Sequence, residues 1–208
     1  MNDPLKPPSA LGRFFGWLRR PSGMSLVSLL VIGAVAGIIF WAGFNEVLHA
    51  TSTDAFCISC HELKDQPYVE YQETPHYKNR SGVRAGCADC HVPRDFVPKL
   101  IRKVEATKEV WGHFTGIIST PEKFEAMRMK MAQVEWESMK ASNSRECREC
   151  HAWDAMAKAK QRPKAQRNHE KAQKEGNTCI DCHKGVAHLL PKEYEPPEEG
   201  TKDSPIIE

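Results

Sequence analysis

The chain of 208 residues carries little net charge and few aromatic side chains. Its formal net charge is +2, so no excess of positive charge points to nucleic acid as a partner. Aromatic residues make up only 8% of the sequence, and much of the apolar content lies in one block near the N-terminus. The remaining, polar part is poorly suited to burying a large protein core. We therefore expect it to pack around apolar bodies other than its own side chains.

Cysteine is absent outside four short motifs, which together contain all eight cysteines. Each motif has the form Cys-x-x-Cys-His, which attaches a c-type haem covalently and offers a histidine to its iron. A disulfide scaffold would not need this histidine, a zinc site would not fix it four times, and iron–sulfur clusters use other spacings. The sequence predicts four covalent haem c groups, which would also supply the missing apolar bodies. Their cysteines are Cys57 and Cys60, Cys87 and Cys90, Cys147 and Cys150, and Cys179 and Cys182.

The nine histidines divide by their position relative to the motifs. His76 and His169 each lie between two motifs, and His188 follows the last one, so we predict these three as distal iron ligands. Such bis-histidine coordination would suit electron transfer rather than ligand activation. The role of His113 stays undecided: it is either a fourth distal ligand or a helix residue that faces solvent or lipid headgroups. His49 is expected at the membrane interface. The predicted proximal ligands are the motif histidines His61, His91, His151 and His183.

The order motif, histidine, motif occurs twice with nearly equal spacing, which indicates a duplicated di-haem module. We expect a mostly α fold in which residues 47–120 form the first module and residues 121–190 the second. An acidic, proline-rich tail, residues 191–208, is expected to be flexible. Apolar residues at helical spacing predict one helix over residues 96–114, and Thr120-Pro121-Glu122 is typical of a second helix start.

An uncharged apolar run from Ser25 to Phe44 predicts a transmembrane anchor, assigned to residues 25–46. Twenty helical residues rise ~30 Å, about the thickness of the hydrocarbon core. A cleaved signal peptide is the alternative, but its apolar region is normally shorter, ~7–15 residues. Residues 1–24 should stay in the cytoplasm and the haem part should be periplasmic, because basic residues precede the run: Lys6, Arg13, Arg19 and Arg20.

Several stretches share one resemblance: Phe56–His61, His76–Arg84, Cys90–Pro93, Lys108–Gly112 and Cys182–His188. In order and spacing they resemble the NapC/NirT/NrfH family of membrane-anchored tetrahaem cytochromes c, and most closely its NapC/NirT branch. The resemblance runs from the anchor to about Pro191. It implies a quinol dehydrogenase of the bacterial inner membrane, which oxidises menaquinol or ubiquinol and reduces a periplasmic reductase. Nitrate reductase is the expected reductase.

The resemblance also implies that the haem of Cys57 and Cys60 lies nearest the membrane and beside the quinol. Lys103 matches the lysine of the family's quinol site and Glu109 its acidic residue, while Lys99 is a second candidate. A carboxylate can accept a quinol proton, and an ammonium group can stabilise negative charge on the quinol oxygen. Many members have methionine where this chain has Leu63, which cannot bind iron. Either His61 ligates the first iron in the ordinary way, or that iron has an unusual ligand set.

Two other functions are compatible with the same motifs. One is a tethered haem carrier that another quinol oxidase reduces, and the other is a haem enzyme that reduces a small oxyanion at an open iron. Turnover of quinol or of nitrite by the purified chain would distinguish the three. The sequence also leaves open whether the chain forms a homodimer.

Overall fold

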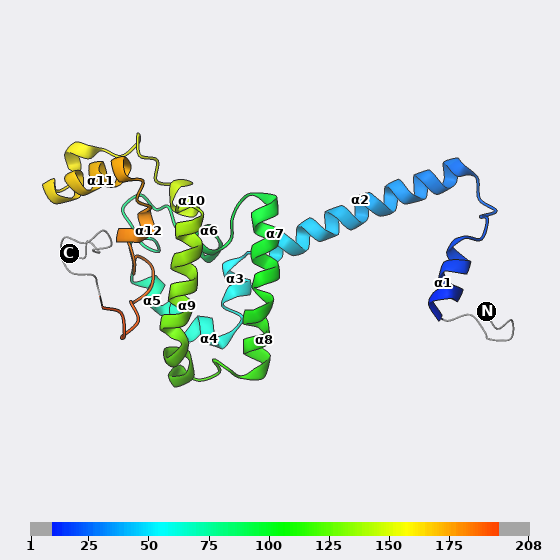
Figure 1. Ribbon diagram of the computed structural model, residues 1–208, viewed down its shortest axis with the longest axis horizontal. Helices are drawn as coiled ribbons and strands as arrows, with labels where there is room; N and C mark the ends of the chain where they lie inside the picture. The colour runs from blue at the N-terminus through cyan, green and yellow to red at the C-terminus, as the bar shows by residue number, and fades with distance from the viewer. Residues whose placement is uncertain (1–9, 196–208) are drawn as a thin grey trace, which may run out of the picture. The chain divides into compact units, whose positions relative to one another are not determined.

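The computed structural model describes residues 10–195, and over this range it contains helices but no strand. The prediction of a mostly α fold is therefore confirmed (Figure 1). The chain divides into two compact units, Met1–Leu48 and His49–Glu208. The first nine residues of the predicted cytoplasmic segment and residues 196–208 of the predicted tail lie outside the described residues.

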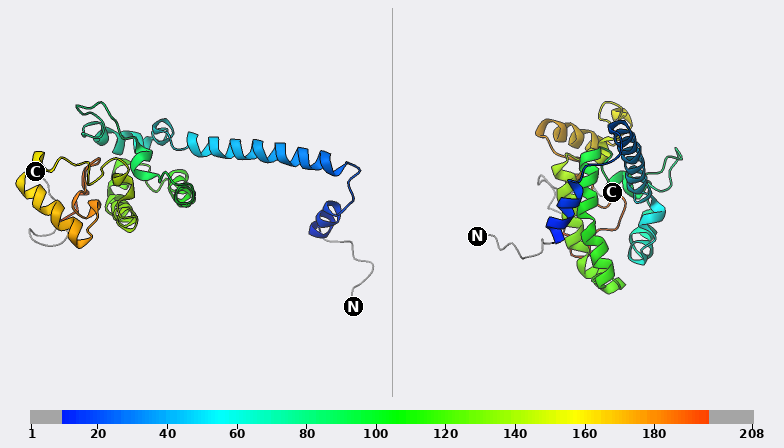
Figure 2. Two further views of the ribbon diagram at one scale, coloured as in Figure 1. Left: turned by 90° about the horizontal axis from the view of Figure 1, so that it is seen from above. Right: turned by 90° about the vertical axis from the view of Figure 1, so that its right-hand side faces the viewer.

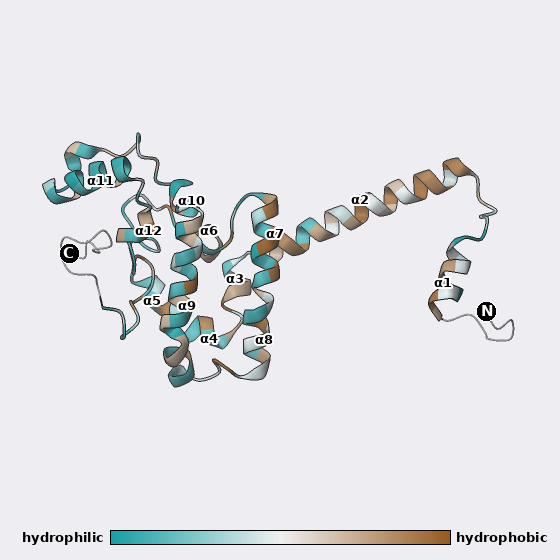
Figure 3. Ribbon diagram, in the orientation of Figure 1, coloured by the Kyte–Doolittle hydropathy of each residue, from teal (hydrophilic) through white to brown (hydrophobic). Residues whose placement is uncertain are grey.

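The first unit contains α1 (Ala10–Leu18) and most of α2 (Leu26–Ala50). Among the described residues, α2 is the one helix long and apolar enough to cross a membrane, and it is hydrophobic along most of its length (Figure 3). The Ser25 hydroxyl accepts a hydrogen bond from the Ser28 N–H at 3.2 Å, close to its start. The helix runs beyond the predicted residues 25–46 to Ala50, and His49 lies exposed in its last turn.

The first two motifs of the second unit are folded as very short helices. The first motif spans the end of α3 (Asp54–Cys57) and the start of α4 (His61–Asp65), and α5 (Pro67–Gln72) follows at once. The second motif forms α6 (Cys87–His91), which contacts α3. The short helices bring together cysteines that lie far apart in the sequence.

The single helix predicted over residues 96–114 is wrong, because the chain forms two helices there. These are α7 (Phe96–Glu105) and α8 (Thr107–Thr115), which are separated at Ala106. The Thr107 hydroxyl donates a hydrogen bond of 2.7 Å to the Val104 carbonyl, and such side-chain bonds compete with the helix ladder and bend helices. Helix α8 then ends at Gly116, whose φ of +69° belongs to the left-handed region that favours glycine.

The helix start predicted at Thr120 is confirmed by α9 (Pro121–Ala141). The Thr120 hydroxyl accepts a hydrogen bond from the Lys123 N–H at 3.4 Å, as expected of a capping residue. Residues of α7 and α9 line a cavity of about 220 Å³. Figures 1 and 2 show the course of the two helices. The later elements are α10 (Arg145–Arg148), a 3₁₀ turn (Lys158–Lys160), α11 (Pro163–Glu175) and α12 (Cys179–Cys182).

Few apolar side chains of the second unit are buried. Of the described residues only Tyr71, Phe124 and Ile180 form a buried hydrophobic core. Large apolar side chains such as Phe56, Ile101 and Val104 remain exposed. This agrees with the expectation that protein side chains alone do not provide the core. Tyr194, in the described part of the predicted tail, packs against Trp136 with ring centres 5.2 Å apart.

Candidate haem and quinol sites

The two motif pairs are held by matching polar contacts. Three residues before the first cysteine of a pair, Asp54 and Ser144 each place a side-chain oxygen on the opposite motif. The Asp54 carboxylate accepts the Cys87 N–H at 2.8 Å, and the Ser144 hydroxyl accepts the Ile180 N–H at 3.1 Å. Ser144 is fully buried, so this contact lies inside the packing of the two motifs.

A second matching contact lies within the later motif of each pair. The Asp89 carboxylate accepts the Gly86 N–H, and the Asp181 carboxylate accepts the Thr178 N–H, both at 2.8 Å. Sequence reasoning missed these two aspartates, although both occupy the position before the second cysteine and that shared position was a usable signal. The repeated contacts are what a duplicated module would produce.

The first cysteines of each motif pair are neighbours. The Cys57 thiol lies close enough to Cys87, and the Cys147 thiol close enough to Cys179, for each pair to interact. All eight cysteines are free of disulfides, so every sulfur is available for a thioether bond. The attachment points of haems one and two are thus adjacent, as are those of haems three and four, where the sites are numbered in motif order.

Each motif histidine faces a second histidine across a similar gap. The ring centres are 6.2 Å apart for His61 and His113, and 6.2 Å apart for His76 and His151. They are 6.1 Å apart for His91 and His188, and 5.9 Å apart for His169 and His183. Eight of the nine histidines are therefore arranged in four pairs. The ninth is His49, at the end of α2.

These separations fit an iron ion between the two rings of a pair. A metal–imidazole bond is about 2.0 Å long, and a five-membered ring with bonds of about 1.33 Å has its nitrogen about 1.1 Å from its centre. Two imidazoles on opposite sides of one metal then have centres about 6.2 Å apart. The cysteine pairs and the histidine pairs thus fit four haem c groups, which when bound would exchange single electrons at iron.

Two of the pairs connect different motif pairs. His76 lies between the first two motifs, yet its ring faces His151 of the third. His188 follows the fourth motif, yet its ring faces His91 of the second. By contrast, His169 faces His183 of its own pair. The symmetry used to predict His76 and His169 as ligands therefore does not extend to the partners that they face.

Outside the first site, three of these rings have Nδ1 within 3.2 Å of an oxygen of another residue. His91 lies 3.2 Å from a Glu135 carboxylate oxygen, His169 lies 2.9 Å from the Gln161 amide oxygen, and His188 lies 3.1 Å from the Pro67 carbonyl. Bonds of this kind orient a ligating imidazole and leave Nε2 for the metal. Nδ1 of His76 is buried and has no hydrogen-bond partner in the described part of the chain.

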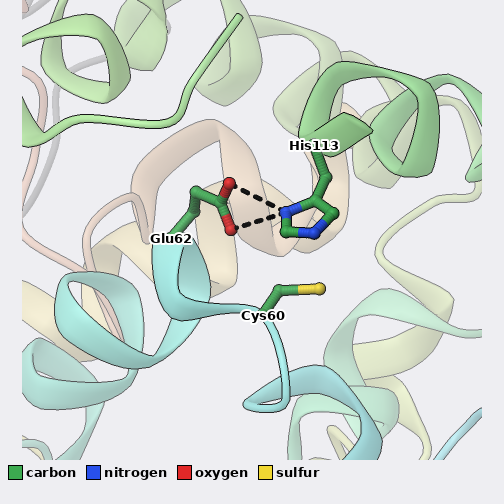
Figure 4. A group of neighbouring side chains, drawn as sticks. All are labelled: Cys60, Glu62 and His113. Carbon is green, nitrogen blue, oxygen red and sulfur yellow. Dashed lines mark hydrogen bonds and ion pairs between the residues drawn. The ribbon is translucent and has the colours of Figure 1, made fainter. Parts of the chain in front are cut away.

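The first site contains an additional carboxylate. Glu62 is buried, and its carboxylate oxygens lie 2.9 and 3.1 Å from Nδ1 of His113, close to Cys60 (Figure 4). One of these oxygens also lies 3.4 Å from Nε2 of His61. Sequence reasoning missed Glu62, because nothing in its spacing distinguishes it from a surface acid. Leu63, the residue next to it, is exposed.

The predicted quinol-site residues lie on α7 and α8 but engage different partners. The Lys103 ammonium group bonds to the Thr51 carbonyl at 2.5 Å and to the Thr51 hydroxyl at 3.1 Å, and it is close enough to Cys57 to interact electrostatically. Burial lowers the pKa of Lys103 below its ordinary value. Glu109 is exposed and pairs with Arg102 at 2.7 Å, so it does not contact Lys103 directly. Lys99 is half-buried on α7.

The motifs, the histidine pairs and the apolar α2 define a c-type cytochrome of electron transport with a helix that fits a membrane anchor. Sequence comparison agrees, and residues 19–193 match the NapC/NirT cytochrome c family, N-terminal region. The chain belongs to this family, and the predicted resemblance is confirmed.

Several relatives are similar over most of the chain. The cytochrome c-type protein NapC of Escherichia coli K12 is 52% identical over 198 residues, which cover 94% of this chain and 99% of NapC. The denitrification system component NirT of Stutzerimonas stutzeri is 56% identical over 182 residues, covering 87% and 90%. The cytochrome c-type protein TorC of E. coli K12 is 48% identical over 177 residues, but these cover only 45% of TorC. No solved structure is significantly similar.

Proposed function

We propose that this chain is a membrane-bound quinol dehydrogenase that oxidises quinol at the periplasmic side of the inner membrane. It passes the electrons singly through four haems to a periplasmic reductase. The observation that carries the proposal is the position of Lys103, a cation held by Thr51 beside the first cysteine of the first motif. A cation there can hydrogen-bond a quinol oxygen next to the first haem.

The haem sites form a continuous chain of neighbours. Contact between Cys57 and Cys87 joins the first two sites, and contact between Cys147 and Cys179 joins the last two. The rings of His76 and His188 cross between these two halves. Electrons need short steps, and this connectivity supports a wire that starts at the first site.

The proposed chemistry at the first site uses residues of this chain. Lys103 would bind the quinol oxygen and stabilise its negative charge as the proton leaves. Glu109, held by Arg102, would accept that proton at its carboxylate. Lys99, which lies on α7 with Lys103, would add positive charge. The haem, when bound beside them, would take up the electrons.

The proposed reductase is a periplasmic nitrate reductase, as the resemblance to the NapC/NirT branch implies. The NapC proteins of E. coli K12 and Haemophilus influenzae match this chain over 99% and 98% of their length. The TorC relatives match over about half of theirs. The proposed topology places the N-terminus in the cytoplasm, since Arg13, Arg19 and Arg20 precede the apolar helix.

The test is quinol oxidation by the purified, haem-loaded protein in detergent with Lys103→Gln. A hydrogen bond to a charged group is worth about 1.5–3 kcal/mol, so we expect kcat/KM to fall about 10- to 150-fold. Haem content and haem spectra should not change. Lys108→Gln, which removes an exposed lysine of α8, is the matched control and should oxidise quinol at the wild-type rate.

Unchanged quinol oxidation by Lys103→Gln would contradict the proposed site. A wild-type protein that neither binds nor oxidises quinol would favour the tethered carrier instead. Turnover of nitrite by the isolated chain would favour the oxyanion reductase, which needs an open iron that four histidine pairs do not provide.

A further inference from the structure

Four of the paired imidazoles have an oxygen within 3.2 Å of Nδ1, and these oxygens differ in charge. At His169 this is the neutral amide oxygen of Gln161 at 2.9 Å, and at His188 it is the carbonyl of Pro67 at 3.1 Å. At His91 it is a carboxylate oxygen of Glu135 at 3.2 Å. His91, like His113 beside Glu62, thus lies next to a negative charge, whereas His169 and His188 have neutral acceptors.

Glu135 comes from the middle of α9, which carries no haem motif of its own. Its side chain is 25% exposed and lines the cavity between α7 and α9 together with Cys90 and His91. The ring centre of His188, the proposed partner, lies 6.1 Å from that of His91. Glu135 contacts His91 and would therefore act on the iron through that ring.

We propose that Glu135 is a positioning residue that sets the reduction potential of the second haem. A carboxylate that accepts the Nδ1 proton of an imidazole increases the electron donation of that ring to the metal. Greater donation stabilises ferric over ferrous iron, so this haem is harder to reduce than one backed by a neutral acceptor. The inference rests on the proposed ligand pair His91 and His188, and not on quinol oxidation.

The test exchanges the two kinds of acceptor in the full-length, haem-loaded protein. Glu135→Gln gives His91 the amide that His169 already has, and Gln161→Glu gives His169 a carboxylate. In redox titrations followed by absorbance and by electron paramagnetic resonance, we expect Glu135→Gln to raise one of the four midpoint potentials. The expected change in the ferrous to ferric ratio is about tenfold, which is 59 mV for a one-electron couple.

Gln161→Glu should move a different component by a similar amount in the opposite direction. Glu137→Gln is the matched control, because Glu137 is an exposed acid of the same helix, α9. It should leave all four potentials unchanged, and the haem content of each variant should remain four per chain.

Four unchanged potentials in Glu135→Gln would overturn the proposal, as would an equal shift of the same component in Glu137→Gln. If Glu135→Gln fails to assemble with four haems, Gln161→Glu decides alone, and an unchanged potential there also overturns the proposal. Chemical reductants drive these titrations, so a failure of the quinol dehydrogenase proposal would leave the result interpretable.

Discussion

The first iron site differs from the other three because one carboxylate, that of Glu62, lies near both of its histidines, His61 and His113. At the other sites, each Nδ1 that has a partner contacts an oxygen of Glu135, Gln161 or Pro67. We propose His113 as the sixth ligand of the first iron and Glu62 as the group that holds it. Leu63 cannot bind iron, so on this proposal α8 supplies a ligand through His113.

The ligand assignment at the first site can be tested by spin state. We expect His113→Ala to convert one of the four haems to a high-spin form, visible by absorbance and by magnetic circular dichroism. Glu62→Gln retains an acceptor for His113 and should keep all four haems low-spin. The reverse pattern, with Glu62→Gln opening the iron and His113→Ala leaving it closed, would make the carboxylate the ligand.

Residue types predicted this chemistry only where a motif fixes them. Covalent attachment and proximal histidines follow from the spacing of the cysteines. Glu62, Glu135 and Gln161 could not be predicted, because a hydrogen bond to a histidine ring depends on the packing of helices distant in sequence and leaves no local pattern.

At the scale of elements, one ion pair joins three segments. The Arg128 guanidinium of α9 donates to the Glu70 carboxylate of α5 at 2.7 Å, and also to the Leu189 carbonyl at 2.6 Å. The Leu189 N–H in turn donates to Glu70 at 2.8 Å. Leu189 follows His188 directly, so this pair holds the segment that brings His188 opposite His91.

The same pair predicts a pH dependence of stability. Burial alone would raise the pKa of Glu70, but the hydrogen bonds from Arg128 and Leu189 outweigh it and hold the pKa below its ordinary value. A carboxyl with a lowered pKa in the folded state stabilises the fold above its unfolded pKa of about 4.3. This contribution is lost as the pH falls through the lower, folded pKa.

We expect Glu70→Gln to destabilise the haem-loaded protein at pH 7 by about 3 kcal/mol, because it leaves a largely buried Arg128 without its counter-charge. Thermal unfolding followed by circular dichroism at pH 7 and at pH 3 measures this. The difference in unfolding free energy between Glu70→Gln and wild type should be smaller at pH 3. Glu137→Gln, which changes an exposed acid of α9, should leave the free energy of unfolding within about 0.5 kcal/mol of wild type at both pH values. An equal difference in unfolding free energy at pH 7 and at pH 3 would contradict the role given to the ionised Glu70 carboxylate.

Helix positions were predictable where a local signal exists. The apolar run and Thr120 gave α2 and the start of α9, and both are confirmed. The break at Ala106 was missed because the periodicity of apolar residues continues through it, while the Thr107 hydroxyl bond that accompanies the bend is a contact that periodicity does not report.

At the scale of the whole molecule, the two motif pairs are interlaced through their histidines. On the proposed pairing, the second iron takes His91 from the first half of the chain and His188 from near its end. We expect His188→Ala to open the haem of Cys87 and Cys90, and to leave the haem of Cys179 and Cys182 low-spin.

Resonance Raman spectroscopy can identify which haem has opened. The iron–histidine stretching frequency of the opened ferrous haem reports on the remaining ligand, so it should fall when Glu135→Gln is added to His188→Ala. It should not respond to Glu135→Gln in a His76→Ala background, where the remaining ligand is His151. His49→Ala should leave every haem low-spin. If adding Glu135→Gln to His188→Ala leaves the iron–histidine stretching frequency unchanged, the proposed pairing of His91 with His188 is wrong.

Crossing of the histidines could not be predicted from the sequence. The repeat predicted His76 and His169 as distal ligands without assigning a haem to either, and His169 faces His183 of its own motif pair. His76 and His188 differ because the short helices of the motifs leave the loops between them free to reach the other half, and only tertiary packing decides which ring they meet.

Interlacing has a consequence for how the protein matures. On the proposed topology the chain is exported from the anchor onward, so Cys87 and Cys90 reach the periplasm and can receive their haem before His188 is exported. Until the last part of the chain is exported, that iron carries one histidine and an open coordination position, able to bind a wrong ligand or to react with oxygen. A chain that stops before residue 188 would retain this reactive iron permanently, so the C-terminal segment works as the final closure of an assembly that began more than a hundred residues earlier.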